Sequence, residues 1–290
     1  MRIDSLAWCD GRVGPVAEAA VTVLDRTLLY GLGAFETLRL HGGRPFLLER
    51  HVERMRRSLS TIGLPVPPLL DRLAEGVPEL SARLDAPSAL CRITVTAGPE
   101  PPPGTDPAAG MRVIALLRPV PPAEVRPVTV GLAPFVHDPG SPIAGVKTTS
   151  YLPHYLQRDA AERAGRLDDL MVDSEGHVNE GTVSNVFGVR EGRLITPPLA
   201  TGILAGVTRG VVLELAAQAG VPVDERALPT GELGLLDECF LTGAGKCLVG
   251  VDVLVGRTLP ARRPVGAALK DALKRRIAAT CGVDVATIRF

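Results

Sequence analysis

Alternation of apolar and polar residues predicts most of the strands. Residues 34–40 (AFETLRL) and 89–96 (ALCRITVT) alternate with the period of two that is typical of a half-buried strand. The same criterion predicts further strands at 4–8, 17–24, 111–118, 127–133, 168–173, 177–180, 183–189, 193–196, 237–242 and 247–254. Turn sequences such as SEG and REG join several of these short strands, which favours antiparallel pairing.

Apolar residues at helical spacing predict the helices. In residues 47–61, Leu48, Val52, Met55 and Leu59 recur every three or four positions, and the following GLP ends the helix. Further helices are predicted at 69–84, 151–164, 206–219 and 265–279. This mixture of helices and strands predicts an α+β fold.

Proline-rich stretches punctuate the chain. Residues 100–107 (EPPPGTDP) indicate an exposed loop, and residues 118–126 (RPVPPAEVR) indicate a linker. The chain is long enough for two domains. We therefore expect a small N-terminal α/β domain over 1–117 and a larger domain over 127–290 with a mixed, largely antiparallel sheet.

Charge and composition exclude several function classes. Thirty-two basic residues balance 32 acidic ones without a basic stripe, so we expect no nucleic-acid partner. No apolar run approaches the ~20 residues of a membrane span, and the N-terminus lacks a signal-peptide pattern, so we expect a cytoplasmic protein without membrane contact. Five cysteines occur without CxxC spacing, and HExxH and GxSxG are absent, which argues against metal and serine-hydrolase sites.

Lysine is rare, which narrows any lysine-dependent chemistry to four positions. Lys270 and Lys274 lie four apart on the last predicted helix and fit its surface, and Lys246 follows GAG without the spacing of a phosphate loop. Lys147 stands in SPIAGVKTTSYL, after apolar residues and before a tyrosine. Desolvation there would lower its pKa and free the amine to form an imine. The alternative is a loop lysine near a helix start.

A longer pattern points to a known family. Residues 168–189 (DDLMVDSEGHVNEGTVSNVFGV) closely resemble the signature of the class IV, fold-type-IV aminotransferases, which use pyridoxal phosphate (PLP). This family includes branched-chain and D-amino-acid aminotransferases and aminodeoxychorismate lyases. Five further segments resemble family motifs in the same order: 25–39 (DRTLLYGLGAFETLR), 51–58 (HVERMRRS), 147–152 (KTTSYL), 201–215 (TGILAGVTRGVVLEL) and 237–251 (DECFLTGAGKCLVGV).

The resemblance implies roles around the cofactor ring. Lys147 matches the lysine that binds PLP covalently as a Schiff base, and Glu180 matches the glutamate that binds the pyridine nitrogen. Asn185 matches an asparagine that supports the neighbouring backbone, and Tyr151 falls where a tyrosine can reach the phenolic oxygen.

The resemblance also implies a phosphate cup. Arg54 matches the phosphate-binding arginine. Val207 and Thr208 would offer backbone N–H groups at a helix start, and Thr208 also a hydroxyl. A second phosphate loop would lie at Gly243 and Ala244, although relatives often carry serine or threonine at the position of Ala244.

The residues expected around the substrate pocket depart most from the sequence pattern of the family. Relatives carry glycine and aspartate where this chain has Thr27 and Leu32, and D-amino-acid transaminases and aminodeoxychorismate lyases often carry arginine where it has Ala97. The predicted substrate-binding residues are Tyr30, Phe35, Thr37 and Arg39. Alternation places the last three on one strand face, where Arg39 could bind a carboxylate or could instead form a surface ion pair.

Three functions remain open from the sequence. The favoured one is transamination between an amino acid, of D-amino-acid or branched-chain type, and a 2-oxo acid. The second is 4-amino-4-deoxychorismate lyase activity, a PLP-dependent β-elimination, and the third is a non-catalytic PLP-binding homologue. The family resemblance further implies a homodimer with active sites at the interface, to which the mean hydropathy of +0.19 adds a weak indication of apolar surface buried between subunits.

Overall fold

The chain forms two compact units. The computed structural model describes residues 5–120 and 127–290. Contacts group the described residues 5–120, 146–151 and 277–287 into a first unit, and residues 127–145, 152–276 and 288–290 into a second. The predicted domains, 1–117 and 127–290, remain a proposal, and residues 121–126 of the predicted linker lie outside the described residues.

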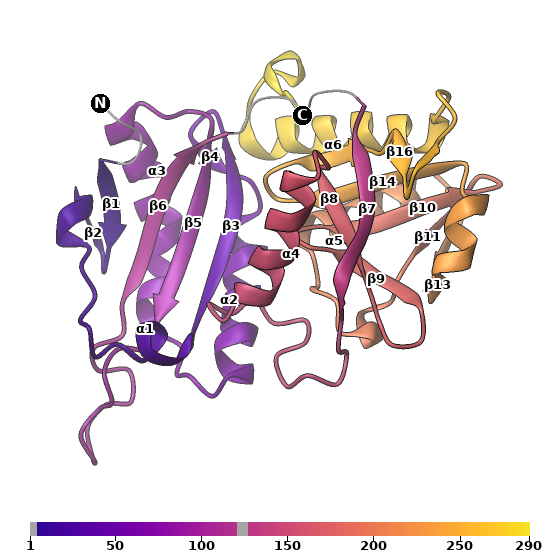
Figure 1. Cartoon of the computed structure of the whole chain (residues 1–290). Helices are drawn as coiled ribbons and strands as arrows, with labels where there is room; N and C mark the ends of the chain where they lie inside the picture. Colours follow the sequence, from indigo (N-terminus) through magenta and orange to yellow (C-terminus); the bar gives the residue numbers. More distant parts are fainter. Residues whose placement is uncertain (1–4, 121–126) are drawn as a thin grey trace. The chain divides into compact units, whose positions relative to one another are not determined.

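The first unit is built on a six-stranded antiparallel sheet in the order β2-β1-β6-β5-β3-β4 (Figure 1). Its strands are β1 (Leu6–Cys9), β2 (Arg12–Pro15), β3 (Gly33–His41), β4 (Arg44–Pro45), β5 (Ala89–Thr96) and β6 (Val113–Pro119). Its helices are α1 (Arg26–Tyr30), α2 (Leu48–Thr61) and α3 (Leu73–Leu84), with 3-10 turns at Val16–Glu18 and Pro68–Arg72.

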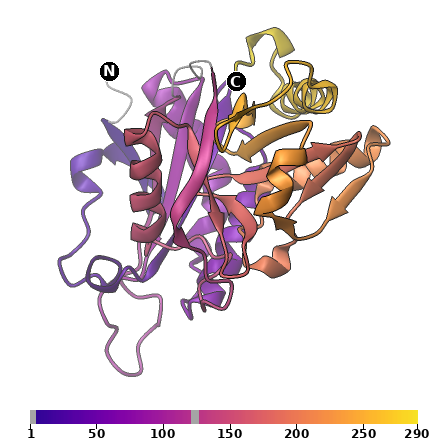
Figure 2. The same ribbon diagram turned by 45° about the vertical axis from the view of Figure 1, so that its right-hand side comes forward.

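One face of this sheet makes the core of the first unit. Leu38 of β3 and Ile93 of β5 pack with Met55 of α2 and Val77 of α3, all almost fully buried. Burying each such side chain contributes roughly 1.5–3 kcal/mol. The loop at 97–112 joins β5 to β6 and extends away from the sheet (Figure 2). Its proline-rich residues 100–107 are exposed as predicted, except for the half-buried Pro101.

The second unit contains two sheets that share an apolar core. One has the order β13-β9-β8-β7-β16-β17 and the other β12-β11-β10-β14-β15. The strands are β7 (Thr129–Val136), β8 (Asp168–Val172), β9 (His177–Gly181), β10 (Asn185–Arg190), β11 (Arg193–Thr196), β12 (Val223–Glu225), β13 (Leu228–Pro229), β14 (Glu238–Gly243), β15 (Cys247–Gly250), β16 (Val253–Leu254) and β17 (Arg257–Thr258). Among the strands of residues 127–290, the parallel pairs are β7–β8, β7–β16 and β11–β12. Val130, Leu170, Val186 and Leu241 belong to the shared core.

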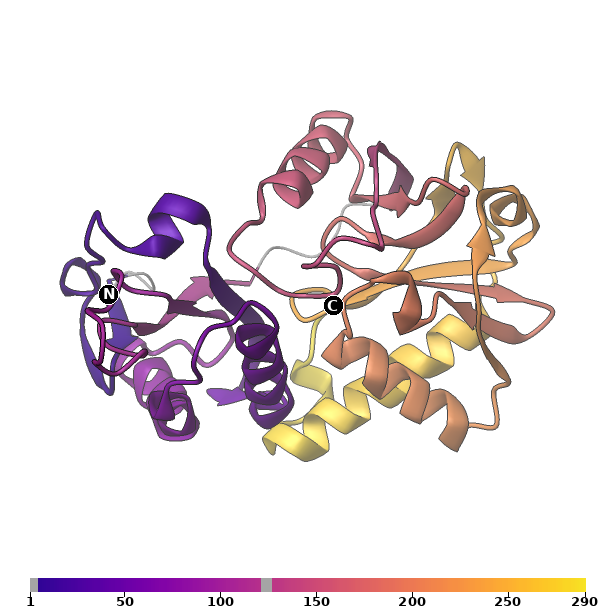
Figure 3. The same ribbon diagram turned by 90° about the horizontal axis from the view of Figure 1, so that it is seen from below.

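Helices cover the outer faces of these sheets. They are α4 (Leu152–Arg163), α5 (Val207–Gln218) and α6 (Pro264–Cys281), with 3-10 turns at Leu199–Thr201, Thr230–Leu235 and Val285–Thr287. Figure 3 shows α5 and α6 side by side, and Arg276 of α6 donates to Glu214 of α5 across them (3.4 Å). Each unit contains both strands and helices, which confirms the α+β prediction.

The strand predicted at 17–24 is wrong. Residues 16–18 form a 3-10 turn, and Val21, Val23 and Leu24 are exposed, so the alternation there does not mark a half-buried strand. The side chain of Asp25 instead accepts from the Thr27 N–H (2.8 Å) and starts α1. Helix α1 ends after one turn at Gly31, whose φ of 69° favours glycine.

Candidate functional site

Lys147 lies on a segment that runs along β3. The Phe35 N–H donates to the Lys147 carbonyl (3.0 Å), and the Thr149 N–H donates to the Gly33 carbonyl (2.9 Å). These bonds hold the backbone of Lys147 as strand pairing would, so the lysine is not on an unsupported loop.

Two aromatic rings flank the Lys147 amine. Its Nζ lies 4.5 Å from the centroid of Phe35 and 5.7 Å from that of Tyr151. The two rings meet edge to face, with centroids 5.1 Å apart. The electron-rich ring faces attract an ammonium group and limit its contact with water. Tyr151 is thus close to Lys147, and its role at the phenolic oxygen stays a prediction.

The sheet face with Phe35 also carries Thr37 and Arg39, as alternation requires. Thr37 lies opposite Arg92 of β5, and the Arg92 guanidinium carbon lies 3.8 Å from the Phe35 ring centroid. Arg39 is buried and lies four residues from Phe35, roughly 13 Å along the strand. Arg92 is therefore better placed than Arg39 to act beside Phe35.

Arg54 forms a buried ion pair on the opposite side of β3. Its Nε and Nη2 each donate to Glu36 (2.7 Å), and His51 Nδ1 also bonds to Glu36 (2.8 Å). Burial alone would raise the pKa of Glu36, but the charge and hydrogen bonds of Arg54, together with His51, lower it to about 2. Burial lowers the pKa of His51. The ion pair fixes Arg54 in place, and its phosphate role stays a prediction.

Thr27 has a structural role at its unusual position. Its Oγ1 donates to the Leu32 carbonyl (2.7 Å) and accepts from the Ala97 N–H (2.8 Å). The hydroxyl thus joins the end of the α1 turn to the residue after β5. Tyr30, at the end of α1, is 73% exposed, and its substrate role stays a prediction.

Glu180 is held in the second unit by neutral hydrogen-bond donors. The Leu204 N–H lies 3.2 Å from both carboxylate oxygens, and Asn185 Nδ2 donates to Oε2 (3.1 Å). Asn185 Nδ2 also donates to the Leu204 carbonyl (2.9 Å), so it ties the carboxylate to the 203–206 backbone. The role that the resemblance implied for Asn185 stays a prediction.

The N-terminus of α5 lies shortly after Leu204 in the sequence. The helix begins at Val207 after Gly206, which provides no side-chain cap, and Thr208 is buried beside it. A Cβ on Gly206 would lie 2.0 Å from Asn185 Oδ1, so only glycine fits there. Helix N-termini attract anions. Gly243 and Ala244 lie at the turn between β14 and β15, and the phosphate roles of all these residues stay predictions.

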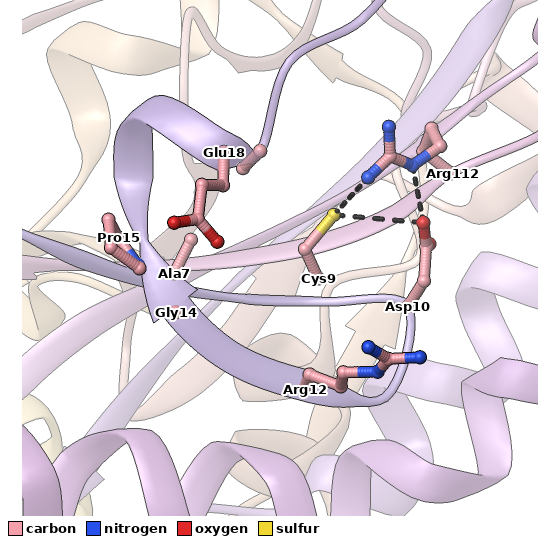
Figure 4. A pocket seen from close by; sticks show the side chains of 9 residues that line it. Ala7, Cys9, Asp10, Arg12, Gly14, Pro15, Glu18 and Arg112 are labelled. Carbon is pink, nitrogen blue, oxygen red and sulfur yellow. Dashed lines mark hydrogen bonds and ion pairs between the residues drawn. The ribbon is translucent and has the colours of Figure 1, made fainter.

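A pocket of about 300 Å³ lies elsewhere in the first unit, against the β1–β2 hairpin (Figure 4). Arg112 spans it, donating to Asp10, to Cys9 Sγ (2.9 Å) and to the Ala20 carbonyl (2.7 Å). None of the predicted site residues lines this pocket, and its Arg112 is paired with Asp10. We therefore do not consider it the active site.

Residues 5–120 and 127–290 contain neither a metal-binding cluster nor a membrane-spanning helix. In that part of the chain, no group of three or more histidine, cysteine or acidic side chains is arranged to hold a metal ion. Nor does the same part contain a helix with the length and apolarity needed to cross a membrane.

Sequence reasoning missed four participants. Arg92 fits the alternating pattern of β5. Its position beside Phe35, however, depends on the pairing of β3 with β5, which are about fifty residues apart in the sequence. Glu36 and His51 could have been found, because polar residues interrupt the apolar faces of β3 and α2. The Leu204 N–H is a backbone group, to which side-chain patterns give no signal.

Comparison with known proteins agrees with these features. Residues 33–254 match the family model for amino-transferase class IV. A Methanocaldococcus jannaschii protein, provisionally named a branched-chain-amino-acid aminotransferase, is 32% identical over 87% of this chain and 88% of its own. The branched-chain aminotransferase of Thermoproteus uzoniensis, solved with norvaline, superposes with a TM-score of 0.84 at 30% identity, covering 94% of this chain and 95% of that one.

A lyase is similar as well. The 4-amino-4-deoxychorismate lyase of Pseudomonas aeruginosa is 30% identical, with a TM-score of 0.79 over 93% of this chain and 98% of that one. These similarities confirm the fold-type-IV prediction, and class IV aminotransferases use pyridoxal phosphate. The chain therefore belongs to the class IV aminotransferase family of PLP-dependent enzymes.

Proposed function

We propose that this chain is a transaminase that moves an amino group between a branched-chain amino acid and a 2-oxo acid. The observation that carries the proposal is the Lys147 amine beside Phe35 and Tyr151, in a segment bonded to β3. The described residues fit PLP chemically: an amine for its aldehyde, a buried carboxylate for its ring nitrogen and a helix N-terminus for its phosphate. The branched-chain type is supported by the names of several relatives.

Lys147 would bind the cofactor and then act as the base. When bound, PLP draws electrons from the substrate Cα. Nζ of Lys147 would be the group that takes the substrate Cα proton and later returns it. The neighbouring rings of Phe35 and Tyr151 would hold Nζ in position for this transfer.

Glu180 would hold the proton on the pyridine nitrogen. A carboxylate beside that nitrogen favours the protonated, electron-withdrawing ring. The Leu204 N–H and Asn185 Nδ2 orient the carboxylate without cancelling its charge, because both donors are neutral. Arg54, the start of α5 at Val207 and Thr208, and the Gly243–Ala244 turn would bind the phosphate.

The face of β3 and β5 with Phe35 and Thr37 would bind the substrate. An apolar ring suits a branched aliphatic side chain, and the guanidinium of Arg92 over that ring suits a carboxylate. Arg92 can thus replace Arg39 as the expected carboxylate partner. An enzyme with both features can accept an apolar and an acidic amino acid in alternate half-reactions.

We also infer a homodimer. Between residues 23 and 30, Val23, Leu24, Leu28, Leu29 and Tyr30 are each more than half exposed. Such a group of exposed apolar side chains within one short segment is unusual on a monomer and supports association with a second copy of this chain.

Lyase activity is the second candidate. It is supported by the 30% sequence identity to the Pseudomonas aeruginosa lyase. It is also supported by Thr37, because branched-chain enzymes more often carry glycine at that position. One assay separates the two activities and also the stereochemistry. The PLP-loaded enzyme is mixed with L-leucine, D-leucine or 4-amino-4-deoxychorismate.

A transaminase converts its bound cofactor to the pyridoxamine form and releases one equivalent of 2-oxo acid from one leucine enantiomer. A lyase instead gives 4-aminobenzoate and pyruvate and leaves the cofactor spectrum unchanged after turnover. Product from 4-amino-4-deoxychorismate alone would overturn the transaminase proposal.

A further inference from the structure

The strand that carries Glu180 is irregular at that residue. In the pairing of β8 with β9, Leu170 faces Gly181 and Val172 faces Val178. Two residues of β9, Asn179 and Glu180, therefore stand opposite the single intervening residue of β8. Such a bulge leaves a residue outside the regular ladder and redirects its side chain. Strand pairing alone does not fix Glu180.

A fully buried carboxylate fastens the turn that follows the bulge. Asp168 Oδ1 accepts from the Thr182 N–H (2.9 Å), from Thr182 Oγ1 (2.6 Å) and from the Asp169 N–H (2.9 Å). Asp168 Oδ2 accepts from Ser184 Oγ (2.7 Å). Two of the three residues in the turn between β9 and β10, Thr182 and Ser184, are thus hydrogen-bonded to Asp168, the first residue of β8.

Gly181 allows this close approach. A Cβ on Gly181 would lie 2.3 Å from Ser184 Oγ and 2.8 Å from Asp168 Oδ2. The Gly181 N–H also donates to the Ser184 carbonyl (2.7 Å), which closes the turn. Residues on both sides of this turn, Glu180 and Asn185, are those that share the Leu204 backbone.

We propose that Asp168 is a positioning residue for Glu180: it holds the turn between β9 and β10 and so keeps the Glu180 carboxylate aligned with Leu204 and Asn185. The inference rests on the proposed role of Glu180. Asp168 forms its bonds within the turn and acts through it. A buried carboxylate with four hydrogen bonds is costly to leave unsatisfied, so the turn has one strongly preferred arrangement.

Two measurements test the positioning. The first is the protonation of the cofactor's pyridine nitrogen in the holoenzyme, followed by NMR with 15N-labelled PLP. In Asp168→Ala, we expect a smaller protonated fraction than in the wild type, with a change in the same direction as in Glu180→Gln. Asp168→Asn should restore most of the signal, because its carbonyl keeps the Oδ1 acceptor and its amide can donate to Ser184 Oγ.

The second measurement uses the apoprotein. Hydrogen exchange at the Leu204 amide should be roughly fivefold to tenfold faster in Asp168→Ala, as expected if one hydrogen bond is weakened. Glu238→Gln is the matched control, because Glu238 is also buried and accepts two backbone N–H groups, from Val265 and Gly266. It should lower the melting temperature and leave both readouts unchanged.

The outcomes separate the two proposals. If Glu180→Gln leaves the ring nitrogen unchanged, the role of Glu180 is wrong. If Glu180→Gln changes it and a folded Asp168→Ala does not, only the positioning inference is wrong. Should Asp168→Ala fail to fold, Ser184→Ala and Thr182→Val each remove one hydrogen bond from the turn. Unchanged Leu204 exchange and ring protonation in both would then overturn the inference.

Discussion

At the scale of single residues, two buried glutamates are held in opposite ways. Glu36 is bound by the guanidinium of Arg54, which compensates its charge within the first unit. Glu180 is bound by neutral donors from Leu204 and Asn185, which orient its charge. Glu36 therefore stabilises the fold around α2 and β3, whereas Glu180 is the carboxylate that we propose for the ring nitrogen.

Replacing Glu180 should affect chemistry more than cofactor binding. Glu180→Gln keeps the shape of the side chain but removes the charge that favours the protonated ring. We expect Cα–H abstraction to slow by on the order of 100-fold, the scale for loss of one preorganised electrostatic partner. The PLP dissociation constant should rise less. Stopped-flow single-turnover rates measure the first effect, and unchanged rates would refute the role.

Arg92 and Arg39 offer a matched pair on one sheet face. If Arg92 binds the carboxylate of an acidic substrate, Arg92→Leu should lower kcat/KM for glutamate by about 10- to 100-fold, since a charged hydrogen bond contributes about 1.5–3 kcal/mol. Activity with leucine should change less. Arg39→Leu is the comparison, and a selective loss of glutamate activity in that variant instead would return the role to Arg39.

At the scale of secondary-structure elements, the pattern of apolar and polar residues predicted those strands and helices that depend on residues close together in the sequence. The bounds of β5 and β11 match the predicted strands, and α2 begins one residue later than predicted. Alternation failed at 17–24, because a period of two in sequence does not provide a neighbouring strand. The bulge at Glu180 was also invisible, since it depends on the register between β8 and β9.

The same distinction applies to the site. Lys147 and Glu180 stand within long contiguous motifs, so the family resemblance predicts a role for each. Arg92 comes to lie beside Phe35 through a pairing of distant strands, and the Glu36–Arg54 ion pair joins a strand to a helix. Such contacts arise from tertiary packing, and no single segment of sequence encodes them.

The Glu36–Arg54 link between β3 and α2 should make stability depend on pH. The pKa of Glu36 falls from an ordinary 4.5 to about 2 on folding, so its contribution is complete above the unfolded value and is lost as pH falls toward 2. From these values, about 2 kcal/mol should be lost between pH 6 and pH 3.

Urea unfolding across that range measures this loss. Glu36→Gln is the control, because it cannot titrate. The difference in unfolding free energy between wild type and Glu36→Gln should shrink as the pH is lowered. A difference that stays constant with pH would show that Glu36 gains nothing from Arg54.

At the scale of the whole molecule, each unit supplies a distinct part of the proposed chemistry. The first carries Lys147 with its aromatic neighbours and the Arg92 face, and the second carries Glu180 and the N-terminus of α5. The exposed apolar stretch at 23–30 lies in the first unit and close in sequence to β3. Association through it would therefore affect the same unit that carries the amine.

Dilution should then reveal a dimer. If a second copy covers the 23–30 stretch, activity and bound PLP should fall together as the protein is diluted. Leu24→Ser with Leu28→Ser should raise the concentration at which this happens, while Val255→Ser, an exposed apolar residue of the second unit, should not. A catalytically competent species of 30.5 kDa in light scattering would contradict the dimer.

The attachment point of the cofactor tests the central claim most directly. Borohydride reduction of the holoenzyme fixes PLP to the amine that holds it, and peptide mass mapping then identifies that amine among the four lysines. We expect the added mass on Lys147 alone, and none in Lys147→Ala. Attachment to Lys246, Lys270 or Lys274 in the wild type would contradict the account.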